Sequence, residues 1–343
     1  MKKVLVYIIY GLLFFVSLWG IQNLEWIQYG LNQGKGQIHL IRSAIPVKDI
    51  YKDASQPDSL IRQLRYLDSV KAYAHEILQL KNSEIYSSIY DQKGEPVMFV
   101  VVAAPEFSLE SYSWSVPLVG TFPYLGFFKK ELAIAKRDSL LKEGLDARIR
   151  IANGWSTMGY IENPLLSENL KKSKGDLANL IIHEITHETV FFRHNAQFNE
   201  NFASFIGDAG ARMLLKDFYG DSSYYFNQYV DDLNDYMKLS DYLIRNAELL
   251  NEMYLSWDSS MPDSLKRELK QERIDKIILG LKKLNFKNPD YGTYFDEFKP
   301  DNSFFMSFIN YRSNQNEFYD TLNNKFKGDL PSYIIDLKNR IGG

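Results

Sequence analysis

The motif H-E-x-x-H at residues 183–187 constrains this chain more than any other feature of its sequence. The surrounding residues 177–190 have apolar side chains at helical spacing, so we expect a helix here. On that helix His183 and His187 lie four residues apart and present both imidazoles from one face. Two imidazoles suit two corners of a tetrahedral zinc site, and Glu184 is offset enough to reach an activated water without binding the ion. The motif therefore predicts a catalytic metal centre with Glu184 as general base.

A catalytic zinc ion needs a third protein ligand and one open position. The candidates downstream of the motif are Glu200 and His194. The pattern H-E-x-x-H-x-x-G-x-x-H fails here at both its glycine and its last histidine, which makes His194 the weaker candidate. If the helix breaks within R-H-N-A-Q and then resumes, Glu200 comes beside the two histidines. This predicts one Zn²⁺ per chain, held by His183, His187 and Glu200.

Composition excludes several other classes of protein. The chain has 343 residues, a net charge of −3 and no cysteine. Disulfides, thiolate zinc sites and a cysteine nucleophile are therefore excluded. Lysines and arginines are spread along the chain and form no basic stripe, so we expect no nucleic-acid partner. Hydrophobic residues make up 45% of the chain, enough for a substantial core.

The N-terminus predicts a membrane helix. Residues 4–21 form an uncharged apolar run after Lys2 and Lys3. The run approaches the length that spans a bilayer as a helix, and no small-residue cleavage site follows it. We therefore expect residues 1–24 to be a single-pass anchor in a bacterial inner membrane, with residues 25–343 in the periplasm. Export after signal cleavage and a simple buried helix are the alternatives.

The remaining pattern predicts an α+β fold. Residues 58–80 carry apolar side chains at helical spacing and predict a long amphipathic helix. Residues 96–128 are rich in β-branched and aromatic residues, interrupted by Pro and Gly, and predict strands and turns. After Lys174 the pattern is mostly helical. We therefore expect a small N-terminal sheet followed by a mostly helical half, in addition to the membrane helix.

Residues 177–210 resemble the signature of a bacterial zinc aminopeptidase family, a gluzincin group that pairs H-E-x-x-H with a downstream N-E-x-F-A. Further similar segments follow the same order along the chain and lie at residues 26–47, 101–128, 155–167 and 301–322. The resemblance implies a zincin-like metallopeptidase domain over residues 25–343, a zinc cofactor and a peptide or protein substrate. Asn199 precedes the glutamate as in gluzincins. Ser204, one turn later, occupies the position where such enzymes place an acid against a ligand histidine, and Asp208, a further turn on, is a second candidate for that orienting role.

Together these features predict hydrolysis of a peptide bond. Glu184 takes a proton from the water that zinc activates, and then passes it to the leaving amine. Tyr311 lies in a helix-like segment that resembles the family and is our first candidate for the donor to the oxyanion, with Tyr160 second. A substrate strand also needs an edge to pair with. We expect that edge at Thr157, Met158, Gly159 and Tyr160.

Three functions remain open from the sequence. An aminopeptidase must bind the free amine of its substrate, and Glu106, Glu162 and Glu188 are equal candidates for that carboxylate. An endopeptidase acting on one protein partner needs no such group. A catalytically silent, membrane-anchored binding or scaffold protein is the third possibility. The intact Glu184 favours an enzyme, because only catalysis needs that carboxylate.

Overall fold

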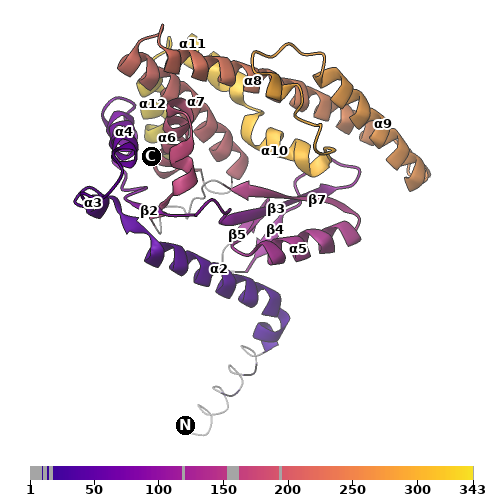
Figure 1. The fold of residues 1–343 in the computed structure, drawn as a ribbon. Helices are drawn as coiled ribbons and strands as arrows, with labels where there is room; N and C mark the ends of the chain where they lie inside the picture. Colours follow the sequence, from indigo (N-terminus) through magenta and orange to yellow (C-terminus); the bar gives the residue numbers. More distant parts are fainter. Residues whose placement is uncertain are drawn as a thin grey trace.

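The computed structural model describes residues 10, 14, 18–117, 120–152, 162–192 and 195–342. Helices dominate this part of the chain, and the strands form three small sheets (Figure 1). The longer helices are α2 (Leu24–Ser43), α4 (Asp58–Glu76), α5 (Lys130–Lys142), α6 (Lys174–Thr189), α7 (Ala196–Tyr219), α8 (Tyr224–Leu255), α9 (Asp263–Leu281), α10 (Asn302–Arg312), α11 (Gln315–Asn324) and α12 (Leu330–Gly342). The single-turn helices are α3 (Val47–Ile50), η1 (Ser167–Lys171) and η2 (Pro289–Tyr291).

The main sheet has the strand order β6-β3-β7 and is antiparallel. Strand β3 (Met98–Pro105) pairs along its whole length with β7 (Leu145–Ala152), and β6 (Leu125–Phe127) covers its other edge. The run M-F-V-V-V-A-A in β3 is buried throughout, as expected for a strand that is covered on both faces. Helix α5 packs against one face, and α10 lies on the other (Figure 1).

The other strands are shorter. Strand β2 (Ser88–Tyr90) pairs with β1 (Ile45–Pro46) on one side and with β8 (Leu165–Leu166) on the other. Strands β4 (Trp114–Val116) and β5 (Gly120–Phe122) form a hairpin. These pieces connect the main sheet to the helices and contribute few residues to the cores.

The helices form two cores above the sheet. In the first, α4, α6, α7, α11 and α12 bury a common set of side chains, with Ile181, Phe202 and Phe205 fully enclosed. In the second, α8 and α9 pack with α10 around Phe305. Helix α10 contacts α7, α8 and the main sheet, so it is the element that joins the helical cores to the strands.

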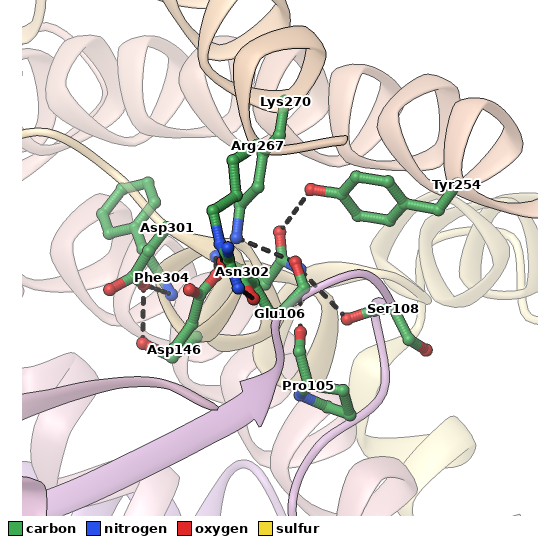
Figure 2. A network of polar contacts seen from close by, with 11 residues as sticks. Pro105, Glu106, Ser108, Asp146, Tyr254, Arg267, Lys270, Asp301, Asn302 and Phe304 are labelled. Atoms are coloured by element: carbon green, nitrogen blue, oxygen red, sulfur yellow. Dashed lines mark hydrogen bonds and ion pairs between the residues drawn. The ribbon is translucent and has the colours of Figure 1, made fainter. Parts of the chain in front are cut away.

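Asn302 fixes the start of α10 against the sheet (Figure 2). Its side-chain amide is fully buried and donates hydrogen bonds to the carbonyls of Pro105, at the end of β3, and of Glu106 and Ser108 in the loop that follows. Its side-chain oxygen accepts a hydrogen bond from the Tyr254 hydroxyl on α8, and its backbone N–H donates to Asp146 on β7. Both polar groups of the side chain are used, so the position of α10 relative to β7 is closely determined.

The observed fold class differs from the α+β class that we expected. Helices precede, separate and follow the sheets, so the chain is mainly helical with small sheets and not an α+β fold with a leading sheet. The strands and turns predicted for residues 96–128 are present as β3, β4, β5 and β6. Two aromatic residues of this segment lie in loops: Phe107 packs in the core around α8 and α9, and Tyr112 packs beneath the main sheet.

The structure also corrects the prediction of an N-terminal membrane helix. Within the described residues, no helix combines the length and the apolar character that crossing a bilayer requires. Residues 1–9, 11–13 and 15–17 of the predicted segment lie outside the description. The expected single-pass anchor in the inner membrane is therefore not supported. The following helix α2 lies along the main sheet, where Gln33 donates a hydrogen bond to the Gly126 carbonyl and Lys136 pairs with Glu25.

Candidate metal centre

Helix α6 carries the H-E-x-x-H motif and is held firmly at its first turn. The Ser173 hydroxyl caps the helix by accepting a hydrogen bond from the Asp176 N–H at 3.1 Å. The ammonium of Lys174 lies 4.5–5.1 Å from the ring centroids of three tyrosines, one each from α4, α7 and α8: Tyr66, Tyr219 and Tyr225. Such cation–π contacts fix the helix to its three neighbours. The histidines of the motif are thus presented by a rigid element.

The chain reverses direction between α6 and α7 through a loop that Asn199 holds in place. Its side-chain oxygen accepts a hydrogen bond from the Phe192 N–H at 2.9 Å, and its amide donates to the Phe192 carbonyl at 2.9 Å. The two helices then pack closely at Gly207, where an added Cβ would lie 2.9 Å from the Asn179 side-chain oxygen. This reversal and close packing place Glu200 opposite the motif.

His183, His187 and Glu200 come together as one group that could hold a metal ion. The two Nε2 atoms lie 3.1 Å apart, and each lies 3.6 Å from the same carboxylate oxygen of Glu200. Ligand atoms about 2.0–2.1 Å from a tetrahedral zinc lie about 3.3–3.4 Å from one another. The observed spacings bracket that value, so the three side chains fit an ion of this size and geometry.

The surroundings of Glu200 keep its carboxylate charged and beside the two imidazoles. The side chains of His183, His187 and Glu200 are 16%, 10% and 21% exposed. Burial disfavours the charged carboxylate, but the interaction with the two imidazoles, each 3.6 Å away, outweighs it and holds the pKa of Glu200 well below its usual range. Burial likewise opposes charge on His187, yet its interaction with Glu200 raises the pKa of the imidazole.

The three residues open onto a cavity of about 710 Å³. Helices α6, α7, α8 and α10 and strand β7 all contribute to its walls. Glu184 lines it too and is only 8% exposed. A carboxylate that reaches the cavity from the residue after a ligand histidine has the placement of a general base. The volume lies within the range of small-ligand sites and suits a substrate of a few residues.

Tyr311 lines the same cavity from the last turn of α10. Burial raises the pKa of its hydroxyl to about 12, and the charge of Glu200 adds to the increase, while Arg150 opposes it. The Arg150 guanidinium lies 5.5 Å from the centre of the Tyr311 ring. Tyr124, just before β6, also lines the cavity, and burial followed by the neighbouring Tyr311 raises its pKa. The hydroxyl of Tyr311 is thus protonated at neutral pH and able to donate a hydrogen bond.

The residues expected to orient the ligands take different partners. Asn199 bonds the loop at Phe192, as described above. Asp208 is buried; one carboxylate oxygen accepts a hydrogen bond from Asn179 at 2.7 Å and the other from Arg312 at 2.5 Å. Ser204 is buried and lines the cavity. These residues stabilise the packing of α6, α7 and α10, and their influence on the histidines stays a prediction.

Other predicted residues lie outside the described part of the chain. These are His194 and the expected substrate-binding edge at Thr157, Met158, Gly159 and Tyr160. Two of the carboxylates proposed for amine binding are paired elsewhere: Glu106 binds Arg267 through two bonds, and Glu188 pairs with Lys81.

Strand β7 was missed by the sequence analysis as part of the site. Its residues 148–152 line the cavity consecutively, so the strand contributes both backbone and alternate side chains to the cavity, while Ile149 packs in the core on the α5 side. Among the described strands, β7 pairs only with β3, so its other edge is free of strand partners. The alternation R-I-R-I-A is visible in the sequence and predicts a strand. It does not show whether the arginine face lines a cavity or faces solvent.

A comparison with protein families gives a match over nearly the whole chain. The model of a family described as "Putative aminopeptidase" matches residues 28–340. Neither the curated proteins nor the solved structures contain a significant match.

Proposed function

Because the chain belongs to this aminopeptidase family, we propose that it is a zinc-dependent peptidase whose ion is held by His183, His187 and Glu200. The spacing of the three proposed ligand atoms supports the metal most directly. Their separations are close to those between ligand atoms around a tetrahedral zinc ion. A group of two imidazoles and one carboxylate is also the donor set of catalytic zinc in peptidases. Zinc at such a site acts as a Lewis acid that makes water acidic and polarises a carbonyl.

Glu184 is the general base of the proposed reaction. It accepts a proton from the attacking water and donates it to the leaving amine when the peptide bond breaks. Its burial at the cavity wall supports this role, because a shielded carboxylate holds and releases a proton without competition from bulk solvent. Tyr311 donates a hydrogen bond from its protonated hydroxyl to the oxygen that gains negative charge.

The substrate is a peptide that pairs with the free edge of β7. A strand edge offers backbone donors and acceptors to an extended chain, and this edge lies along the cavity that contains the ligand group. Asp176 and Asp232, at the cavity wall formed by α6 and α8, are carboxylates available for a free amine. Burial raises the pKa of Asp232 and the charge of the nearby Asp176 adds to the increase, while a hydrogen bond with Asn288 opposes it. A free amine on the substrate would pair with these two carboxylates, which favours aminopeptidase activity.

Metal analysis and a Glu184→Gln variant test the proposal together. We expect about one zinc per chain in both proteins, because Glu184 is not a ligand. We expect the variant to lose peptidase activity by at least roughly 100-fold, since it lacks the base. Glu188→Gln is the matched control. Glu188 lies one turn further along α6 and pairs with Lys81, so this variant should retain peptidase activity.

Two outcomes would contradict the proposal. Activity of Glu184→Gln equal to that of the unsubstituted protein would exclude Glu184 as the base. Stoichiometric zinc without turnover of any peptide would instead favour the binding or scaffold alternative. Comparing free with N-acetylated peptides distinguishes the two peptidase classes, because only an aminopeptidase requires the free amine.

A further inference from the structure

Two arginines stand side by side on the cavity wall formed by β7. Arg148 and Arg150 are two residues apart on a strand, so their side chains point to the same face. Both line the cavity that contains His183, His187 and Glu200. The proposed peptidase mechanism assigns a reaction to neither of them.

Aromatic rings hold the two guanidinium groups in place. The guanidinium carbon of Arg148 lies 4.6 Å from the centre of the Phe298 ring and 4.8 Å from that of Phe304. That of Arg150 lies 5.5 Å from the centre of the Tyr311 ring. Stacking of this kind orients an arginine while leaving its N–H groups free for a ligand.

Both arginines have N–H groups that lack a partner. The Nη1 of Arg148 and the Nε of Arg150 are buried and make no hydrogen bond to any described residue. Buried donors are normally satisfied, so each unpaired donor calls for an explanation. An anion bound in the cavity beside the two guanidinium groups would offset part of the cost of leaving these donors unpaired.

The charge of this arginine pair is poorly balanced by the protein. Arg312, the third arginine at the cavity, is neutralised by its ion pair with Asp208. Asp301 is the acidic group that acts on Arg148, but one of its oxygens is engaged in capping α10 through the Phe304 N–H and the Ser303 hydroxyl. The β7 wall is therefore positive, while Asp176 and Asp232 add negative charge, and Lys172 one positive charge, elsewhere in the lining.

We propose that Arg148 and Arg150 bind a carboxylate of the substrate, so that the enzyme prefers peptides that carry an acidic group in addition to their amine. This inference rests on the proposed peptidase function for the identity of the ligand as a peptide. The carboxylate belongs either to the C-terminus of a short peptide or to an Asp or Glu side chain. Planar guanidinium groups match the geometry of either source.

Calorimetry on the zinc-loaded Glu184→Gln protein tests the proposal without turnover. The first pair of ligands is Ala-Ala-Ala with a free C-terminus and its C-terminal amide. The second pair is Ala-Glu-Ala amide and Ala-Gln-Ala amide. We expect the carboxylate form of at least one pair to bind roughly 10- to 100-fold more tightly, as hydrogen bonds to a charged partner imply. The pair that shows the preference identifies the source.

Variants assign the preference to the two arginines. In the Glu184→Gln protein, Arg148→Gln and Arg150→Gln should each reduce the ratio of the affinity for the carboxylate form to the affinity for the amide form. The double variant should bring this ratio close to one. Arg137→Gln is the matched control, because Arg137 pairs with Asp138 on α5 away from the cavity, and the ratio should be unchanged. Arg148→Lys keeps a charge and should keep part of the preference. It serves as a second variant if Arg148→Gln fails to fold.

The outcomes separate this inference from the proposed function. Equal affinities within both pairs, absence of binding by all four peptides, or a preference that survives in the double variant would each overturn the carboxylate site. A preference for the carboxylate that depends on the arginines supports the site even if the unsubstituted enzyme hydrolyses nothing. Conversely, hydrolysis that depends on Glu184 and treats acids and amides alike would support the peptidase while excluding the carboxylate site.

Discussion

The Arg312 guanidinium lies 2.5 Å from the carboxylate of Asp208, and both side chains are buried. Asp208 comes from α7 and Arg312 from α10, while the second oxygen of Asp208 accepts a hydrogen bond from Asn179 on α6. One carboxylate thus joins three of the helices that line the cavity. The Arg312 guanidinium also lies 4.9 Å from the centre of the Tyr236 ring, which extends the connection to α8.

We predict that Asp208→Asn lowers the free energy of unfolding by roughly 3–5 kcal/mol, because it leaves Arg312 charged and buried without a counterion. The double variant Asp208→Asn/Arg312→Met should recover much of this loss. Urea denaturation measures both. The exposed pair Lys287–Asp231 is the control, and Asp231→Asn should change stability by less than about 1 kcal/mol. A similar small effect for Asp208→Asn would show that the buried pair does not hold the helices together.

Gly207 is predicted to be intolerant of a side chain. An added Cβ would lie 2.9 Å from the side-chain oxygen and 3.1 Å from the backbone oxygen of Asn179, so Gly207→Ala must push α7 away from α6. We expect a loss of about 1–3 kcal/mol in unfolding free energy and weaker zinc binding, because the helices carry the ligands. In contrast, Gly34 in α2 has open space around it. Gly34→Ala should stabilise the protein by roughly 0.5–1 kcal/mol in the same assay.

Tyr311→Phe should lower kcat by roughly 100- to 1,000-fold, the usual cost of removing one donor to an oxyanion. Zinc content and KM should change little, because the hydroxyl acts on the transition state. Steady-state kinetics on the metal-loaded enzyme provide the measurement. Tyr319→Phe is the control, since this ring packs against Phe205 in the helical core. An unchanged kcat in Tyr311→Phe would require another donor, for which Tyr124 is the nearest candidate at the cavity.

Glu200→Gln should weaken zinc binding by more than roughly 100-fold, because changes to residues that only support a metal ligand already cost 10- to 100-fold. Equilibrium dialysis against zinc measures the affinity. In the unsubstituted protein, chelation of the metal should lower the melting temperature, and added zinc should restore it. This temperature shift should be nearly absent in Glu200→Gln. Retention of tight stoichiometric zinc by the variant would exclude Glu200 as a ligand.

The sequence predicts best those elements whose signal is local. The helix expected at residues 58–80 is present as α4, which ends at Glu76. The helix that carries H-E-x-x-H is α6. The three residues proposed as ligands come together although Glu200 lies on the next helix, α7. In these cases apolar spacing and the chemistry of the side chains both point to the same arrangement.

The walls of the cavity could not be predicted in the same way. Arg148 and Arg150 belong to the site only because β7 pairs with β3 and α10 covers that sheet, and these contacts join distant parts of the chain. Residues 96–128 show a related limit: the predicted strands are present, but Phe107 and Tyr112 pack into the cores from loops. Aromatic side chains that fill a core from a loop have the same composition as those that build a strand. Local patterns do not distinguish the two, because tertiary packing decides between them.

The bonds from Asn302 to the end of β3 and the loop that follows have a consequence for synthesis of the protein. The carbonyl of Pro105 leaves the ribosome 197 residues before the amide that binds it. Until α10 emerges, the face of β3 and β7 that it covers in the folded protein stays exposed, and exposed surface of this kind favours aggregation. Because Tyr311 lies on the same late helix, a chain that is still being translated cannot yet have the complete cavity around His183, His187 and Glu200.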